Sequence, residues 1–358
     1  MAKRVKPGVV SGSDYAAVVA KAKAGKYALP AVNVVGTNTV NAVLEAAAEA
    51  KSDVIIQLSN GGAVFYAGKG YPDTFEAGVL GAVAAAQHVH LLAERYGVCV
   101  VLHTDHANRK LLPWLDALLT EGEKWFERTG RPLYSSHMID LSEEPLLENL
   151  DTCATFLRRM NKIDMSIEIE LGVTGGEEDG VGHDVDLSAE NPKLYTQPSE
   201  VLEAYKMLNP LGDFSIAASF GNVHGVYKPG NVKLRPEILK ASQEMVQREY
   251  GTADNPLNLV FHGGSGSEKS KITQAVDYGV FKMNIDTDTQ FAFANAVGSY
   301  VEENTRAFMH QLDPDDGRPY KKVYDPRKFL RSGEVNLNAR LQEAFRDLGA
   351  IGTSAAHV

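Results

Sequence analysis

The stretch Met165-Ser-Ile-Glu-Ile-Glu-Leu171 decides between two ways of building an α/β fold from this chain. Successive side chains of a strand point to opposite faces, so the aliphatic residues share one face while Ser166, Glu168 and Glu170 share the other. An inner strand of an open parallel sheet is apolar on both faces, because helices cover both. Buried carboxylates need a metal, a cation or a polar barrel mouth. The pattern therefore favours a closed barrel over an edge strand with one solvated face.

Other apolar runs of strand length alternate with helical stretches along the chain. The eight expected strands are Leu29–Asn33, Asp53–Ser59, Val98–His103, Leu133–His137, Met165–Leu171, Phe214–Ser219, Leu257–His262 and Gly279–Asn284. The helical stretches include Val40–Lys51, Val79–Tyr96, Pro145–Asn161, Pro236–Tyr250 and a later helix near Asn336–Leu348. This alternation predicts a single-domain (β/α)8 TIM barrel over residues 1–358, with an open doubly wound sheet as the alternative.

Composition narrows the classes of partner. The 358 residues carry a formal net charge of −10 and show no basic stripe, so we expect no nucleic-acid binding. Cys99 and Cys153 are too few and too scattered for a disulfide framework or a thiolate zinc site. The N-terminus lacks the apolar stretch of a signal peptide, and no run is expected to reach transmembrane length. These features predict a cytoplasmic protein that does not bind membranes.

Polar residues gather where the expected strands end. They are Asn33, Ser59, His103–His106, His137–Asp140, Glu170, His224, His262 and Asn284–Asp286. Active sites of parallel barrels occupy the carboxyl ends of the strands. We therefore expect one site at this end, with Asn33 as a candidate substrate contact.

Three histidines follow three different strands, namely His106, His224 and His262. Imidazoles that converge from separate strands and leave a coordination position for substrate are typical of a catalytic zinc site. Zinc is the preferred metal, with cobalt, iron and manganese as alternatives, and His103 is a competing ligand. Glu170 and Asp140 would form a second divalent position or orient the histidines. Asp140 could instead cap the helix that follows it.

Two loops rich in glycine and hydroxyl side chains follow the last two expected strands. His262-Gly-Gly-Ser-Gly-Ser267 opens one helix, and Asn284-Ile-Asp-Thr-Asp-Thr289 opens another. Phosphate groups in such barrels commonly bind at the loops after strands seven and eight, against a helix N-terminus. The pattern predicts an anion site here, with Lys228 of the preceding loop nearby.

Two longer segments lack strong periodicity. Gly172-Val-Thr-Gly-Gly-Glu-Glu-Asp-Gly180 begins a stretch of roughly 25 residues, which is long enough for a lid that carries a base to the substrate. The ligand spacing of a helix–loop–helix calcium site is absent from it. A second excursion, from Asp313 to Gly333, is rich in Pro, Gly and Asp and contains Lys321-Lys-Val-Tyr-Asp-Pro-Arg327. Its residues alone indicate a solvated surface loop.

Seven segments together resemble class II fructose-bisphosphate aldolase, in the longer-chain subgroup with an acidic lid. They are Leu102-His-Thr-Asp-His106, Ser135-Ser-His-Met-Ile-Asp140, Glu168-Ile-Glu-Leu-Gly172, Gly175-Gly-Glu-Glu-Asp-Gly180, Ala218-Ser-Phe-Gly-Asn-Val-His-Gly225, Phe261-His-Gly-Gly-Ser-Gly-Ser267 and Lys282-Met-Asn-Ile-Asp-Thr-Asp288. The resemblance covers nearly the whole chain. It implies reversible cleavage of fructose 1,6-bisphosphate to dihydroxyacetone phosphate and glyceraldehyde 3-phosphate through a zinc-stabilised enediolate.

The resemblance also implies roles for residues. Asp105 would move the proton at the aldehyde oxygen, and Glu178 would move the C–H proton. The zinc ligands would be His106, His224 and His262, with a second metal position at Asp140 and Glu170. Contacts to the dihydroxyacetone phosphate half would come from Gly225, Gly263, Gly264, Ser265, Asn284, Ile285, Asp286 and Thr287. Ser59 would contact the other half, and Arg327 would reach the far phosphate from the partner subunit of a homodimer. A monovalent cation near the phosphate is implied as well.

Alternatives of other classes stay open from the residues. Lys282 shares strand parity with Asn284, so its amine could face the barrel as the nucleophile of a Schiff-base aldolase. A hydrolase that uses metal-bound hydroxide and a non-catalytic sugar-phosphate sensor fit the same fold. A sister aldolase for tagatose or sedoheptulose bisphosphate differs only in stereochemistry, which the sequence does not specify.

Overall fold

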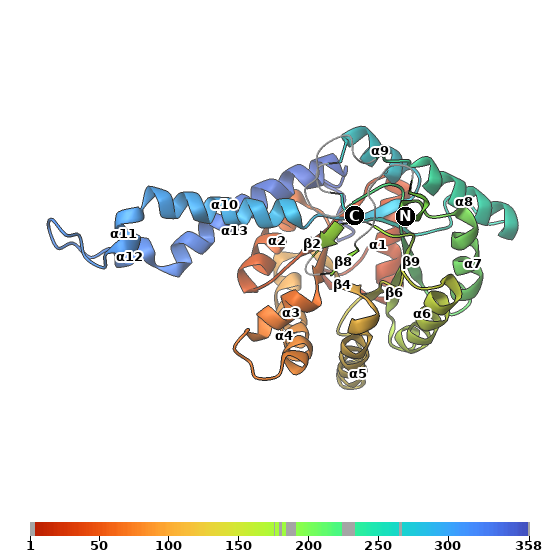
Figure 1. Ribbon diagram of the computed structural model, residues 1–358, viewed down its shortest axis with the longest axis horizontal. Helices are drawn as coiled ribbons and strands as arrows, with labels where there is room; N and C mark the ends of the chain where they lie inside the picture. The colour runs from red at the N-terminus through yellow and green to blue at the C-terminus, as the bar shows by residue number, and fades with distance from the viewer. Residues whose placement is uncertain are drawn as a thin grey trace.

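The computed structural model describes residues 4–174, 176–178, 181–183, 191–223, 233–264 and 267–356, with the side chains of 176–178 and 181–183 left out. Eight parallel strands close into a barrel (Figure 1). In barrel order they are β2 (Leu29–Asn33), β3 (Val54–Leu58), β4 (Cys99–Ala107), β5 (Ser136–Ile139), β6 (Ser166–Leu171), β9 (Phe214–Ala218), β10 (Leu259–Phe261) and β11 (Val280–Asn284). The pairing of β11 with β2 completes the ring. The closed barrel is confirmed, and the open sheet is excluded.

Each expected strand is present, and in two of them an end is shifted by three or more residues. β4 runs on to Ala107 instead of ending at His103, so the residues expected in the following loop belong to the strand. β5 begins at Ser136, where its pairing with β4 and β6 starts, while Leu133 and Tyr134 are buried ahead of the paired segment. A short additional strand, β1 (Gly8–Val9), pairs with the start of β4. Apolar character marked these segments correctly, while hydrogen-bonded pairing set their ends.

Helices surround the barrel as an outer ring. They are α1 (Gly12–Gly25), α2 (Thr37–Ala50), α3 (Asn60–Ala67), α4 (Thr74–Tyr96), α5 (Leu112–Thr129), α6 (Leu146–Met160), α7 (Pro198–Leu208), α8 (Glu237–Tyr250) and α9 (Lys269–Asp277), with short 3-10 turns at Arg109–Leu111, Asn161–Ile163 and Pro192–Leu194. Four of the expected helices begin one to five residues from their predicted starts, as boundaries read from periodicity commonly do.

Helix α4 shows how local sequence sets an element and its packing. Asp73 caps its start by accepting from the Glu76 amide at 3.0 Å, and Gly97 ends it in a left-handed conformation. At Gly81 a β-carbon would lie 1.8 Å from the carbonyl oxygen of Ala63, so only glycine allows α3 and α4 to approach this closely.

Helix α4 also corrects one expectation, because it is long and apolar enough to cross a membrane by length and composition. It is the one such helix in the described part of the chain. It packs against α3, α5 and β4, and its alanine-rich face is buried. Buried helices of globular folds pass the same test, so we assign α4 to the outer ring.

The acidic segment after β6 contains more order than its composition predicted. β7 (Gly176–Glu178) and β8 (Val181–His183) pair as an antiparallel hairpin, with Glu178 opposite Val181. Strands this short leave no periodic signal in the sequence, because three residues hold less than two repeats of the alternation.

The excursion from Asp313 to Gly333 is helical for most of its second half, so its interpretation as a solvated loop was wrong. α10 (Thr287–Glu303), α11 (Thr305–Met309), α12 (Lys321–Tyr324) and α13 (Pro326–Asp347) form an arm that projects from the barrel (Figure 1). The side chain of Asp325 accepts from the Arg327 amide, and Pro326 occupies the first helical position. Because of these two signals, α13 begins at Pro326, well before the start near Asn336 that the sequence predicted for this helix.

Candidate metal centre and active site

The polar face of β6 points into the barrel, as its alternation predicted. Glu168 and Glu170 are both buried, with 2% and 0% of their surface exposed. Each Glu168 oxygen accepts a hydrogen bond of 2.8 Å from the Lys282 ammonium. The sequence predicted that the buried carboxylates need a cation or a metal as partner, and for Glu168 this partner is the cation Lys282. An amine held by two hydrogen bonds to a carboxylate is not free to attack a carbonyl, which argues against the Schiff-base alternative.

The second carboxylate lies among the predicted metal ligands. Glu170 Oε2 is 3.5 Å from His106 Nδ1 and 3.7 Å from His262 Nδ1, and the two imidazole rings meet edge to face with centroids 4.7 Å apart. Asp140 Oδ2 lies 3.1 Å from His106 Nδ1. All four side chains are buried and come from the ends of four different strands. The structure brings these four predicted residues together at one point.

The donor set fits a divalent ion. His106, Asp140 and Glu170 form one group whose ligand atoms lie within 4.8 Å of one another, and Asp105, His106 and His262 form another. Buried imidazole with carboxylate suits zinc and the other first-row metals. Burial alone would lower the pKa of His106, yet the nearby Asp105, Asp140 and Glu170 raise it well above its usual value. A centre that draws a proton onto a buried imidazole is one that a bound cation would stabilise.

The third predicted histidine, His224, lies outside the described residues. The described residues include the start of its loop, where the side-chain amide of Asn222 donates to the His262 carbonyl oxygen at 2.9 Å. This hydrogen bond ties the loop after β9 to the loop after β10.

A strand irregularity explains why Asp105 and His106 both reach the site. Strict alternation would put His103 and Asp105 on one face and His106 on the other. The pairing of β4 with β5 shifts register between Thr104 and Ala107, and such a shift re-aims side chains. The competing ligand His103 lies deeper, with Nδ1 2.7 Å from Ser136 Oγ and Nε2 3.6 Å from Glu168.

Asp105 is held by amide groups from three strands. Asn33 and Gln57 each donate to Oδ2 at 3.0 Å, and Asn284 lies 3.4 Å from Oδ1. Burial would raise the pKa of Asp105, but the charges of His106, Lys282 and His262 and the hydrogen bond from Asn33 lower it below the usual value. The side chain is thus an oriented, ionised carboxylate beside the predicted metal ligands His106 and His262.

Asp140 faces the predicted metal ligand His106 with one carboxylate oxygen and closes a local turn with the other. Its Oδ2 faces His106, while its Oδ1 accepts from the Ser142 amide at 3.2 Å and from Ser142 Oγ at 2.8 Å. It does not cap α6, whose cap position is Pro145. The turn that Asp140 closes therefore fixes the carboxylate for the metal centre.

The predicted substrate residues fall into three groups. Asn33, Ser59, Gly263, Gly264, Asn284, Ile285, Asp286 and Thr287 lie at the carboxyl ends of their strands or open the next helix. Gly225, Lys228 and Ser265 lie outside the described residues, and only the backbone of Glu178 is described. Arg327 lies in the arm, 89% exposed, where it donates to Asp325 at 2.7–3.0 Å.

Two backbone features shape the loop after β10, the first of the two predicted phosphate loops. Gly263 adopts a left-handed φ of +59°, and a β-carbon on Gly264 would lie 2.3 Å from Met283 Cε. Glycine at both positions therefore follows from local geometry. Ser59 caps α3 by accepting from the Gly62 amide at 3.0 Å, so its role includes local structure.

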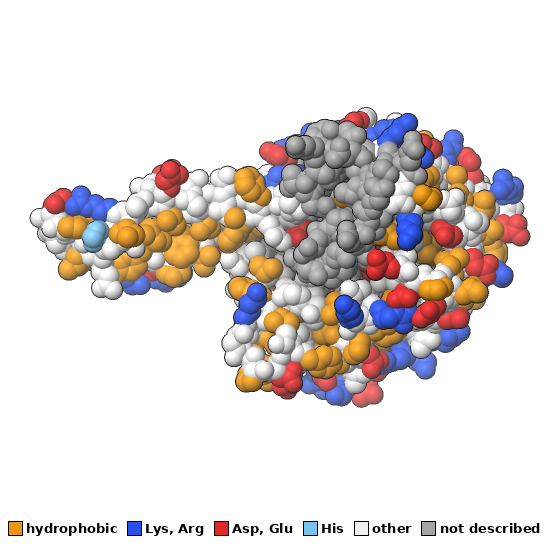
Figure 2. Space-filling view, viewed as in Figure 1, with side chains coloured by type: hydrophobic (Ala, Val, Ile, Leu, Met, Phe, Trp, Pro, Cys, Tyr) orange, Lys and Arg blue, Asp and Glu red, His pale blue; other side chains and the backbone are white. Residues whose placement is uncertain are grey.

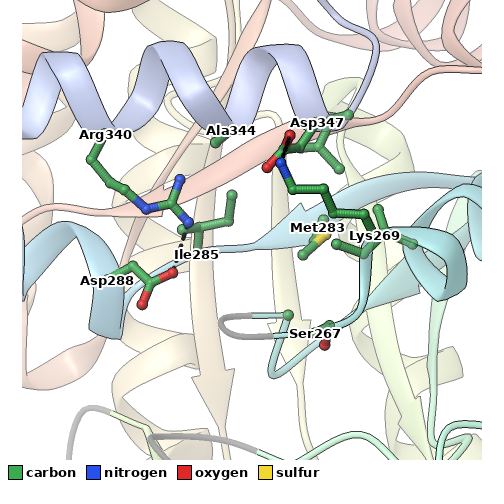
Figure 3. Close-up of a pocket in the computed structure, with 11 residues that line it drawn as sticks. Ser267, Lys269, Met283, Ile285, Asp288, Arg340, Ala344 and Asp347 are labelled. Carbon is green, nitrogen blue, oxygen red and sulfur yellow. Dashed lines mark hydrogen bonds and ion pairs between the residues drawn. The ribbon is translucent and has the colours of Figure 1, made fainter.

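A cavity of about 220 Å³ lies behind these loops, between β11, α9 and α13 (Figure 3). Arg340 pairs with Asp288 at 2.7 Å and Lys269 pairs with Asp347 at 2.6 Å. Its lining includes Gly264 and Ile285 but none of the described metal-centre side chains. The Arg340–Asp288 pair joins the arm helix α13 to the first turn of α10, and thereby supports from outside the second loop that the sequence predicted to bind phosphate.

Sequence reasoning missed Gln57 and the pairing role of Lys282. Gln57 interrupts the apolar run Val54–Leu58, and its side chain is completely buried. A lone polar residue inside a fully buried strand is a usable signal, because such a group must have a buried partner.

Replacement of His137 is expected to reduce the acid sensitivity of the fold. His137 Nδ1 lies 2.8 Å from Thr104 Oγ1, and burial lowers the pKa of His137 to about 3. Between about pH 6.5 and that value the unfolded chain binds a proton that the folded chain does not, so stability falls as the pH falls. For His137→Asn, the slope of unfolding free energy against pH should decrease by about 1.4 kcal/mol per pH unit in this window.

Urea unfolding of the metal-free protein between pH 4 and 7 measures this slope. His310→Asn, on the exposed arm, is the control and should retain the parental slope. An unchanged slope for His137→Asn would show that His137 is not the buried neutral group responsible.

Comparison with known proteins decides the family. A family model described as class II fructose-bisphosphate aldolase matches residues 13–353. The chain belongs to this family. It is 56% identical over 353 residues to fructose-bisphosphate aldolase from Haemophilus influenzae, and equally so to fructose-bisphosphate aldolase class 2 from Escherichia coli K12, with 97% of each chain covered. The crystal structure of fructose-bisphosphate aldolase from Campylobacter jejuni superposes with a TM-score of 0.89 at 54% identity, covering 98% of both chains.

Membership of the class II aldolase family confirms the resemblance of the seven segments and the barrel fold. The chain is therefore an aldolase, a carbon–carbon lyase. The class II family is generally metal-dependent and acts on sugar bisphosphates, which agrees with the two buried groups that could hold an ion.

Proposed function

We propose that this chain cleaves fructose 1,6-bisphosphate to dihydroxyacetone phosphate and glyceraldehyde 3-phosphate, and catalyses the reverse condensation in the cytoplasm. The observation that carries the proposal is the approach of the Asp105 carboxylate to the ligand nitrogens of His106 and His262, within 4.8 Å, at the carboxyl end of the barrel. Carbon–carbon cleavage beside a ketone needs an electron sink and a base close together, and this geometry supplies both.

We assign the electron sink to a divalent ion, with zinc as the first choice. His106 and His262 would hold it together with His224, while Asp140 and Glu170 would serve a second divalent position or orient the imidazoles. When bound, the metal polarises the substrate carbonyl and stabilises the negative charge left by bond cleavage.

The side chains would move the two protons. In cleavage, the Asp105 carboxylate accepts the proton of the C4 hydroxyl as the C3–C4 bond breaks, and the aldehyde leaves. Glu178 then supplies a proton to C3 of the remaining half, and condensation runs both transfers in reverse. The lowered pKa of Asp105 supports a base in the cleavage direction, because the carboxylate is ionised before substrate binds.

The loops after β10 and β11 would bind the phosphate of the dihydroxyacetone half. Amide groups of Gly263, Gly264 and the range 284–287 lie at the loops where barrels bind phosphate, and the last of them opens the 17-residue helix α10. Gly225, Ser265 and Lys228 would complete this site, with a monovalent cation beside it. Ser59 and Asn33 would contact the aldehyde half.

We further propose that two copies form a dimer through the arm. Exposed apolar side chains on the arm include Phe291, Met309, Leu312 and Val335, which are 67%, 72%, 55% and 53% exposed. Figure 2 shows hydrophobic side chains gathered along one face of it. A contiguous exposed apolar surface marks an interaction site. Because Arg327 lies in the projecting arm, it would serve the site of the partner subunit.

Subunit mixing tests the role of Arg327. Arg327→Ala is expected to raise KM for the bisphosphate about 10–100-fold, because a phosphate loses a charged partner. At a substrate concentration well below the raised KM, mixing the Arg327→Ala and Asp105→Ala proteins under conditions of subunit exchange should increase activity above that of either protein, since one site of the mixed dimer then has both residues. If Arg327 acts within its own chain, the mixture will be no more active than its components.

Metal removal tests the proposed function itself. Prolonged dialysis against a chelator should abolish cleavage of fructose 1,6-bisphosphate in a coupled triose-phosphate assay, and stoichiometric zinc should restore it. Cobalt, iron and manganese are compared in the same add-back, and tagatose bisphosphate serves as the competing substrate. Full activity after demetallation, covalent trapping by borohydride or release of inorganic phosphate would each contradict the proposal in favour of a different chemistry.

A further inference from the structure

A buried ion pair lies beneath the metal centre and takes no part in the proposed proton transfers. Glu168 and Lys282 are each about 2% exposed, and both carboxylate oxygens lie 2.8 Å from the Lys282 ammonium. Burying two charges inside a barrel costs free energy that their attraction often fails to recover. Stability alone therefore gives no reason for this pair.

Glu168 also contacts a predicted metal ligand. Its Oε1 lies 2.9 Å from His262 Nε2, and its Oε2 lies 3.6 Å from His103 Nε2. A carboxylate that accepts two hydrogen bonds from an ammonium is ionised and has only acceptors to offer. Nε2 of His262 therefore carries a hydrogen that it donates to Glu168, and Nδ1 is the nitrogen on the side of Glu170, 3.7 Å away.

We propose that Glu168 is a positioning residue that fixes the tautomer and orientation of His262 so that Nδ1 faces the metal, and that Lys282 fixes Glu168. The proposal rests on the proposed metal-dependent function. Carboxylates that accept from the outer nitrogen of a ligating histidine hold the ring and raise its basicity, and their loss commonly reduces metal affinity about 10–100-fold.

Lys282 has a distinct part in this arrangement. Without a cation, a buried carboxylate 2.9 Å from a ligating imidazole would itself compete for the metal. The ammonium engages both oxygens, which keeps Glu168 in the barrel interior and leaves Glu170 as the carboxylate at the centre.

Double variants test the positioning role without leaving an uncompensated buried charge. Glu168→Leu/Lys282→Met removes the acceptor together with its counterion, whereas Glu168→Gln/Lys282→Met retains a neutral acceptor for His262. Ser166→Ala is the matched control, because Ser166 is buried on the same inward face of β6 one alternation earlier. Circular dichroism and urea unfolding establish that each variant is folded before metal is added.

Two measurements decide the outcome. Zinc and cobalt affinities, obtained by competition with a chromophoric chelator, should fall about 10–100-fold in the leucine variant, less in the glutamine variant and not at all in Ser166→Ala. In metal-free protein labelled with ¹⁵N-histidine, the His262 resonances, assigned with His262→Asn, should report the Nε2–H tautomer in the parent and glutamine variant. The leucine variant should show a mixture.

Parental metal affinity and an undisturbed Nε2–H tautomer in the leucine variant would overturn the proposal. A parent enzyme that binds no divalent ion would instead contradict the proposed function. The tautomer measurement on metal-free protein would still decide whether Glu168 positions His262.

Discussion

Asp105→Ala is expected to reduce kcat for cleavage of fructose 1,6-bisphosphate by about 10²–10⁴-fold, while bound metal stays at the parental level. The reason lies in the environment of the carboxylate. Asn33 and Gln57 hold Oδ2, and Asn284 approaches Oδ1, so amide donors already engage both oxygens. A carboxylate oriented in this way, with a lowered pKa, is suited to accept the substrate proton.

The same geometry allows a competing interpretation, in which Asp105 is itself a metal ligand. Its carboxylate lies within 4.8 Å of the ligand nitrogens of His106 and His262. Metal analysis of the purified variants separates the two roles. Asp105→Asn, which keeps the shape of the side chain but cannot accept a proton, should lose turnover as Asp105→Ala does. Loss of metal in step with activity would make Asp105 a ligand.

The two roles of Asp105 also predict changes in different kinetic quantities. A proton-transfer residue changes kcat and leaves KM nearly constant, because substrate binding does not depend on it. A lost ligand lowers the fraction of active enzyme and is partly rescued by excess zinc. Titration of each variant with zinc therefore provides a second test that does not depend on one metal measurement.

The barrel could be predicted because alternation is a local property that folding preserves. The residues Ser166, Glu168 and Glu170 share a face in any extended strand, and two carboxylates on one face of an inner strand favour a closed barrel with a polar interior. That His106 and His262 lie at one end of the barrel followed from strand order, since all parallel strands end at one rim. These inferences needed no knowledge of the individual contacts.

What could not be predicted depends on register and on long-range pairing. Alternation along β4 placed His103 with Asp105, and only the register shift between Thr104 and Ala107 brings His106 to the same site. The choice of Lys282 as the partner of Glu168 joins residues 114 positions apart, which no local pattern encodes. Gln57 was missed for the same reason, because its partners lie on other strands.

The prediction for the arm was wrong for a different reason. The excursion from Asp313 to Gly333 is rich in Pro, Gly and Asp, and this composition led to the prediction of a solvated loop. The Asp325–Pro326 pair, an N-cap followed by proline at the first helical position, was a local helix start that composition concealed.

Lys282→Met is expected to destabilise the metal-free protein by about 3–5 kcal/mol, because it leaves Glu168 buried without its counterion. The ammonium is completely enclosed and engages both carboxylate oxygens, so no solvent can replace it. Urea unfolding followed by tryptophan fluorescence measures the change. Glu168→Gln/Lys282→Met should recover most of the loss, since both charges are then absent.

A double-mutant cycle with Glu168→Gln quantifies the coupling between the two side chains, which should be well above the few tenths of a kcal/mol typical of independent sites. The cycle also bears on the chemistry. In a Schiff-base enzyme Lys282→Met would abolish turnover completely and borohydride trapping with it, whereas a metal enzyme should retain measurable cleavage in the folded double variant. A coupling near zero would mean that Lys282 and Glu168 do not form their pair in solution, and both the stability argument and the positioning of His262 would then lack their physical basis.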